Sequence, residues 1–150
     1  MTTIARLVTP EEQAIRFFRE VKNELGIDST RKIVSVVRCV LSQLRNSLSH
    51  DQVEVLIRKM PDIFQLLLIS NWRYEEKEVS VTHLDELADN VYRYTLSQEK
   101  KLFSTEIEAL NTVILVIKKL DKFFGLLGFN VLRYTITQEI KQAAEMEDAA

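Results

Sequence analysis

The fold is decided by residues 33–48, whose sequence is IVSVVRCVLSQLRNSL. Its larger apolar side chains recur at the three- and four-residue spacing of an amphipathic α-helix, and they fall within about 100° of one another at 3.6 residues per turn. They are Ile33, Val34, Val37, Val40, Leu41, Leu44 and Leu48. The opposite side carries Ser35, Arg38, Cys39, Ser42 and Asn46. The stretch therefore predicts a helix with one buried face, and it places Cys39 on the polar face.

The same pattern returns 76 residues further along the chain, where Val34 aligns with Leu110 and Leu44 aligns with Leu120. The register continues past the turns that follow, so that Met60 aligns with Ile136. Internal repetition of this kind is typical of a duplicated unit. We therefore expect a single domain over residues 1–150, built from two related halves at about 9–72 and 82–144. Residues 73–80 would connect them, and 145–150 would form a frayed tail.

Capping signals divide the rest of the chain into helices. The sequence Thr9-Pro10-Glu11-Glu12 predicts a helix over 10–25 that is closed by Gly26. Further helices are predicted at 49–60, 62–72, from Thr82 to about 91, 105–124, 129–134 and 136–144. With only three glycines and two prolines in 150 residues, the sequence predicts an all-α fold, a compact bundle of about seven to eight helices.

Two of these helices carry more apolar residues than one buried stripe needs. The predicted helix 62–72 is apolar on several sides, so we expect it to be central. In helix 105–124, Ile107, Ile114 and Leu115 replace polar residues of the first half, and we expect them to be covered by another helix or by a second copy. The neighbouring lysines 118, 119 and 122 oppose self-association, which favours an internal cover and a monomer over a homodimer.

Composition excludes several classes of protein. Basic and acidic residues nearly balance at 20 and 22, so no overall field draws the chain to nucleic acid or to an anionic membrane. The most apolar window, 63–69, is too short to span a bilayer. The first residues lack a secretory pattern, and the single Cys39 fits a reducing compartment, so we expect a cytoplasmic protein.

The chemistry-bearing residues are few. His83 and Glu86 share a helical face, but a bundle metal site needs a second such pair, and none exists here. His50 lies within a capping sequence, and Arg38 and Arg45 near Cys39 could stabilise a thiolate. The packing interpretation is favoured for each, so we assign no catalytic, cofactor-binding or metal-binding residue and expect no cofactor.

Several stretches carry a family resemblance: Phe18 to Gly26, Val36 to Arg45, Leu56 to Pro61, Trp72, and Thr82 to Leu87. They resemble the bacterial domain of unknown function 2267 family over residues 14–92. The chain departs from that family at 68–72 and at the turn 125–128. The resemblance implies a bacterial, cytoplasmic, all-helical domain of repeated halves, and it implies no activity, cofactor or catalytic residue.

Two functional hypotheses remain open. The favoured one is a non-enzymatic protein-interaction or scaffold domain with an unidentified protein partner and no role for nucleic acid or membrane. Its candidate contact residues are Trp72, Arg73, Tyr74, Ile114 and Leu115, since Trp, Tyr and Arg are enriched at binding hot spots. The alternative is a small-ligand-binding protein or enzyme with a pocket between the two halves.

Overall fold

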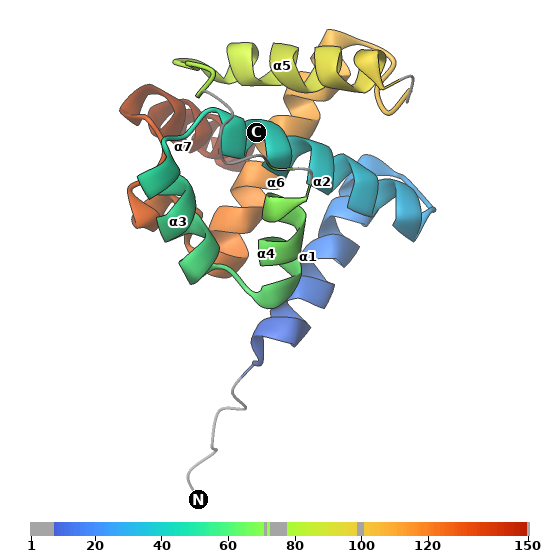
Figure 1. The fold of residues 1–150 in the computed structure, drawn as a ribbon. Coiled ribbons are helices and arrows are strands. Elements are labelled where there is room, and N and C mark those ends of the chain that lie inside the picture. Colours follow the sequence, from blue (N-terminus) through green and yellow to red (C-terminus); the bar gives the residue numbers. More distant parts are fainter. Residues whose placement is uncertain (1–7, 71, 73–77, 99–100, 150) are drawn as a thin grey trace, which may run out of the picture.

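The computed structural model describes residues 8–70, 72, 78–98 and 101–149, with side chains described as far as Met146. Within these ranges the chain forms seven α-helices and one short 3-10 helix, and no strand (Figure 1). The prediction of an all-α fold is therefore confirmed.

Three of the first four helices begin at a side chain that caps their first turn. The four are α1 (Pro10–Leu25), α2 (Thr30–Asn46), α3 (His50–Lys59) and α4 (Asp62–Ile69). The hydroxyls of Thr9, Ser29 and Ser49 each accept a hydrogen bond from a backbone N–H of the following first turn. Gly26 closes α1 at a φ of 65°, a left-handed conformation that glycine adopts without steric cost. The predicted bounds of α1 are confirmed.

The second part of the chain follows the prediction less closely. Its elements are α5 (Leu84–Ser97), α6 (Glu106–Phe124), the 3-10 helix η1 (Leu126–Phe129) and α7 (Tyr134–Ala149). The predicted short helix at 129–134 is replaced by η1, which ends where Asn130 adopts a left-handed φ of 59°. The last helix begins before Ile136 and continues past Ala144 to Ala149.

The start of α5 also differs from the prediction, because a tertiary contact replaces the local cap. His83, rather than Thr82, precedes the first helical residue, and its side chain makes no capping hydrogen bond. The backbone N–H of Leu84 instead donates to Oε1 of Glu139 in α7, at 3.1 Å. Glu139, 55 residues further along the chain, therefore supplies the hydrogen-bond acceptor that we expected from the Thr82 hydroxyl.

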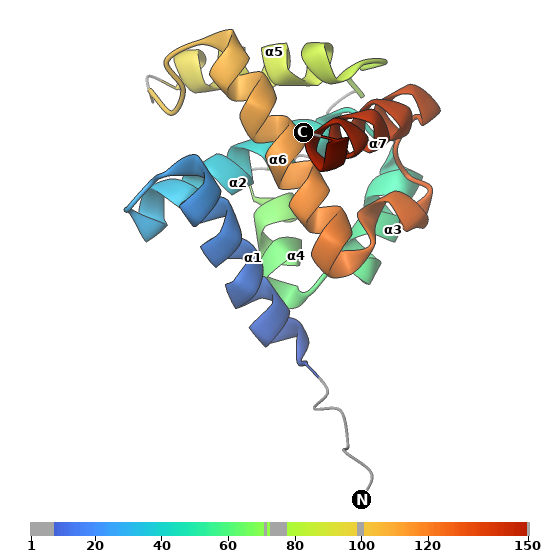
Figure 2. The ribbon, with the colours of Figure 1, turned by 180° about the vertical axis from the view of Figure 1, so that it is seen from behind.

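α6 is the central helix of the fold. It packs against α1, α2, α5, α7 and η1, and Figure 2 shows it running between them. Ile114 and Leu115 are half-buried, so internal neighbours cover them in part. Ile107, in the first turn of the helix, is 72% exposed. No other helix within the described ranges covers Ile107, because Ala109, which has no exposed surface, is the residue of that turn that faces the core. Cover of Ile107 by a second copy stays a prediction.

The prediction that the fourth helix is central was also wrong in part. α4 ends at Ile69, short of Trp72, and it buries only one side. Phe64, Leu67 and Leu68 enter the core, whereas Ile63, Leu66 and Ile69 are exposed. The surplus of apolar residues on α4 therefore faces outward.

Aromatic rings join α1, α4 and α6. The ring of Phe64 meets Phe17 edge-on at a centroid distance of 5.1 Å and stacks on Phe18 at 5.5 Å. It also contacts Phe124 of α6 at a centroid distance of 5.0 Å. Such contacts add to the apolar burial that holds α4 in place.

The element boundaries agree with the 76-residue shift at two points. α2 begins at Thr30 and α6 at Glu106, while α3 begins at His50 and η1 at Leu126. Aligned residues such as Val37 and Val113 are buried in both helices. However, α3 is an α-helix of ten residues and η1 a 3-10 helix of four. The duplication therefore stays a prediction.

Candidate interaction surface

Of the five predicted contact residues, the structure describes Trp72, Ile114 and Leu115. Trp72 is half-buried against the core, where its ring meets the ring of His50 at 5.9 Å. Ile114 and Leu115 lie in the central helix α6 and are half-buried. Arg73 and Tyr74 lie outside the described residues. The role of these five residues as a contact surface therefore stays a prediction.

Four exposed apolar side chains belong to α1 and α4, two helices that lie side by side in both views (Figures 1 and 2). Ile15 of α1 is 58% exposed and Leu66 of α4 is 62% exposed. Ile63 and Ile69, one turn on either side of Leu66, are 43% and 46% exposed. We call these four residues the α1–α4 face. Two of the four, Ile15 and Ile63, line a common groove, whereas hydrophobic residues exposed singly are normal on a folded domain.

A groove of about 550 Å³ runs beside Ile15 and Ile63. Its described lining comes from α1, α2 and α4, and it consists of Glu11, Ala14, Ile15, Phe18, Arg19, Lys22, Thr30, Ile33, Val34, Pro61, Asp62 and Ile63. The lining is largely apolar, with charged residues at its rim. We call it the α1–α4 groove.

The wall of this groove is held by packing. Phe18 lines the groove and is stacked on Phe64, which has no exposed surface. Ala14 and Ile33 are themselves buried core residues. Because these side chains belong to the core, the groove is a preformed feature of the folded chain, as ligand and partner sites usually are.

The charges at the rim are separated by sign. Glu11 and Asp62 also line a neighbouring hollow with Pro10 and Gln13, which places both carboxylates at the end near the start of α1. Arg19 and Lys22 lie two to three turns further along α1. Nζ of Lys22 donates to Oγ1 of Thr30 at 3.5 Å, at the start of α2. The groove thus has an acidic end and a basic end.

The sequence contains a signal for this surface, namely apolar residues beyond those that a single buried stripe needs. Ile15 falls outside the stripe of Ala14, Phe18 and Val21 that predicts the buried side of α1. Spare apolar residues of a helix can lie in a core or on a binding surface, and periodicity does not separate the two. Only the packing of α4 decides between them.

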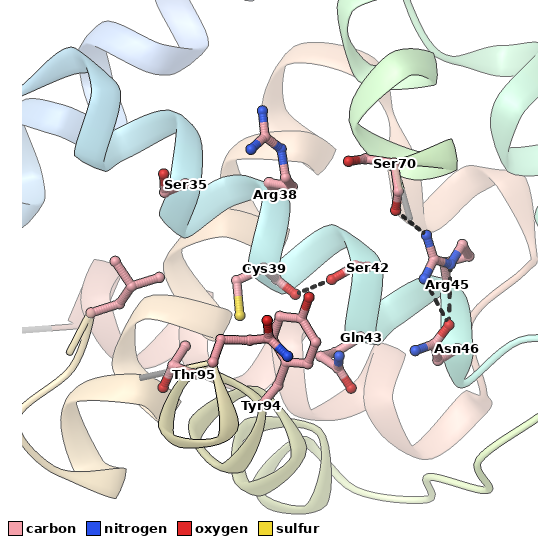
Figure 3. Close-up of a pocket in the computed structure, with 12 residues that line it drawn as sticks. Ser35, Arg38, Cys39, Ser42, Gln43, Arg45, Asn46, Ser70, Tyr94 and Thr95 are labelled. Atoms are coloured by element: carbon pink, nitrogen blue, oxygen red, sulfur yellow. Dashed lines mark hydrogen bonds between the residues drawn. The ribbon is translucent and has the colours of Figure 1, made fainter. Parts of the chain in front are cut away.

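A second cavity, of about 170 Å³, lies between α2 and α5 (Figure 3). Its described lining is mostly polar: Ser35, Arg38, Cys39, Ser42, Gln43, Arg45, Asn46, Ser70, Tyr94, Thr95, Gln98 and Leu102. It includes the polar face predicted for residues 33–48. α5 covers part of that face, so that Cys39 and Ser42 are buried although they lie on the polar side of α2.

Cys39 is a buried thiol in this cavity wall. It is 4% exposed, and its Sγ donates to the backbone carbonyl of Val91 in α5 at 3.8 Å. Ser42 Oγ donates to the carbonyl of Cys39 at 3.0 Å. Arg38 is exposed beside them. A buried thiol with a carbonyl acceptor fits the packing interpretation of Cys39.

The titratable residues of the other candidate sites do not converge. Nδ1 of His83 lies 3.4 Å from Oε1 of Glu139, at the junction of α5 and α7. His50 contacts Trp72 at the start of α3. Among the described residues, no three His, Cys, Asp or Glu side chains gather closely enough to hold a metal ion.

The groups with shifted pKa values lie in an ion-pair network between α1 and α6. Hydrogen bonds from Lys119 and Lys122, both 2.7 Å from Oε1, lower the pKa of Glu20. Burial disfavours the charged form of Lys119, but its hydrogen bonds to Glu20 and Glu24 outweigh that effect and raise its pKa. Neither Glu20 nor Lys119 lines a cavity described above, so we interpret the network as structural.

The chain matches no protein-family model, and none of the curated proteins is similar to it. The resemblance to the domain of unknown function 2267 family therefore stays a prediction. None of the helices within the described ranges combines the length and the apolar character that a membrane span requires.

Proposed function

We propose that this protein is a non-enzymatic interaction domain of a bacterial cytoplasmic protein and that it binds a protein partner through the α1–α4 face. The observation that carries the proposal is the exposure of Ile15, Ile63, Leu66 and Ile69 beside a preformed groove. The buried thiol of Cys39, which forms no disulfide, is consistent with a reducing compartment.

The energetics favour a partner for this face. Fully burying a large aliphatic side chain contributes about 1.5–3 kcal/mol relative to leaving it in water. The four side chains of the face are each between 43% and 62% exposed. Covering them therefore supplies several kcal/mol toward association, which is typical of the apolar centre of an interface with a charged rim.

The proposal is tested by crosslinking in the cells that make the protein, followed by capture of the tagged chain. We expect one or more crosslinked protein partners for the wild type. Replacing both apolar anchors, Ile15→Lys with Leu66→Lys, should reduce their yield at least about tenfold, because two lysines would have to be desolvated in the contact.

Ile107→Lys is the matched control. Ile107 is as exposed as the anchors but lies on α6, away from the α1–α4 face. We expect this variant to capture the same partners as the wild type. The proposal is contradicted if the Ile107→Lys variant loses the partners. It is also contradicted if the double variant keeps native helical content and still captures the partners.

The polar cavity between α2 and α5 favours a second candidate function, the binding of a small polar ligand between the halves. Its volume of about 170 Å³ is below the 300–1,000 Å³ typical of ligand pockets, so this candidate ranks second. A ligand from a fragment screen that raises the melting temperature of the wild type, but not of Tyr94→Phe with Arg38→Ala, would support it. The absence of any such ligand would count against it.

A further inference from the structure

We infer that the partner of the α1–α4 groove is a second copy of this chain, packed antiparallel across a two-fold axis that passes beside Ile15. The inference rests on the proposed function and names its occupant. A two-fold interface uses the same patch on both copies, so the patch must be complementary to itself. The α1–α4 groove meets that requirement in charge and in shape.

The charge pattern along α1 is centred on Ile15. Glu11 lies four residues before it and Arg19 four residues after it, and all three line the groove. Residues four apart lie on the same side of a helix. When two copies of α1 cross antiparallel at Ile15, Glu11 of each therefore faces Arg19 of the other.

Both charged residues are available for this pairing. Glu11 and Arg19 are exposed, and neither makes an ion pair with any residue that the structure describes. The second pair at the rim repeats the arrangement, with Asp62 at the acidic end and Lys22 at the basic end. The antiparallel packing brings the acidic end of each groove to the basic end of the other, and the two-fold axis produces this contact at two equivalent places.

The shape of the surface is self-complementary in the same sense. Ile15 projects from α1 with 58% of its surface exposed, next to the hollow that Ala14, Phe18 and Ile63 line. Packing of helix side chains into the groove of a facing helix is the usual mode of helix association. Each Ile15 can enter the groove of the other copy, where Ile63 forms the opposite wall.

This inference departs from the monomer that the sequence analysis favours. That preference rested on the lysines around Leu115 in α6, where Lys119 and Lys122 prove to be engaged with Glu20. The antiparallel pairing uses α1 and α4 and leaves that part of α6 outside the contact.

The experiment is sedimentation equilibrium of the full chain over about a hundredfold range of concentration. We expect a reversible monomer–dimer equilibrium for the wild type. Glu11→Arg alone and Arg19→Glu alone should each raise the dissociation constant at least about tenfold, because each substitution places like charges together at two positions of the symmetric dimer.

Charge exchange distinguishes this arrangement from other modes of association. An equimolar mixture of the Glu11→Arg and Arg19→Glu variants should form a heterodimer. The first variant then carries arginine at both positions and the second carries glutamate at both, so every contact between positions 11 and 19 joins opposite charges. The double variant Glu11→Arg with Arg19→Glu should recover the homodimer within about threefold of the wild type, and added salt should weaken it.

Arg16→Glu is the control for charge alone, since Arg16 is exposed on α1 but does not line the groove. It should leave the dissociation constant unchanged. Circular dichroism must first show native helical content in each variant. Three results would then overturn the inference: a wild type that stays monomeric, an Arg16→Glu variant that dimerises as weakly as Arg19→Glu, or a mixture of the two charge variants that does not associate. The two proposals can fail separately. If the wild type is monomeric in sedimentation but the Ile15→Lys, Leu66→Lys double variant still loses the crosslinked partners, the second copy is excluded and the proposed function is not.

Discussion

Arg45 of α2 is 3% exposed, and its guanidinium joins two elements of the first half. Nη1 donates to the backbone carbonyl oxygens of Leu68 at 2.7 Å and Ser70 at 3.0 Å, at the end of α4. Nε and Nη2 both donate to Oδ1 of Asn46. The end of α4 therefore depends on a side chain from another helix for its hydrogen bonding.

We predict that Arg45→Lys destabilises the protein by about 2–3 kcal/mol, although it keeps the positive charge. Lysine lacks the planar fork of donors that reaches two carbonyls and an amide together, and buried acceptors left unpaired cost about 1–3 kcal/mol each. Urea unfolding followed by circular dichroism measures the difference.

Arg38→Lys is the control for this prediction, since Arg38 is exposed on the same helix. Its effect should stay within about 0.5 kcal/mol. If the two substitutions lowered the free energy of unfolding equally, the hydrogen bonds of Arg45 to the end of α4 would not account for the loss.

At the scale of elements, the contact between α1 and α6 combines apolar burial with an ion-pair network. Lys119 is largely covered, with 13% of its side chain exposed, and it lies 2.7 Å from Glu20 and 3.0 Å from Glu24. Lys122 reaches the same oxygen of Glu20 from the next turn of α6. Glu20 therefore meets two cations, which explains the direction of its pKa shift.

We predict that Glu20→Gln lowers the free energy of unfolding at neutral pH by about 1–2 kcal/mol, after allowance for partial exposure to solvent. The pKa of Glu20 is lowered in the folded state, so its contribution is present above the ordinary value of 4.5 and is lost as the pH falls through the lowered value. The difference between wild type and variant should therefore shrink in acid, as measured by urea unfolding at several pH values.

Glu54→Gln is the matched control, because Glu54 pairs with Arg58 at an exposed position within α3. Its effect should be at most about 0.5 kcal/mol. A Glu20→Gln variant whose deficit grows in acid would contradict the proposed origin of the pKa shift.

The elements also differ in how far the sequence predicted them. α1 could be predicted to its ends, because Thr9 and Gly26 act locally and need no tertiary partner. The start of α5 could not, since Glu139 supplies its acceptor from α7. The local rules hold where capping is local and fail where a distant residue replaces the cap.

At the scale of the whole molecule, the sequence predicted the all-α class but not the candidate surface. Periodicity predicts the burial of most of the stripe in residues 33–48, although Val34 is only half-buried, and it predicts the burial of Val113, Val116, Ile117 and Leu120 in α6. Which side of α4 enters the core is decided by Phe64 and its aromatic neighbours in α1 and α6. The same packing turns Leu66 outward, and periodicity within α4 does not contain that information.

The central claim is that the protein acts by docking on the α1–α4 face. The most direct test places a photo-crosslinking amino acid at Leu66, which is 62% exposed, or at Ile107, which is 72% exposed on α6. Irradiation of the cells that make each variant should give discrete crosslinked products from position 66 and none from position 107. Equal yields from the two positions, or no product from position 66, would contradict the claim.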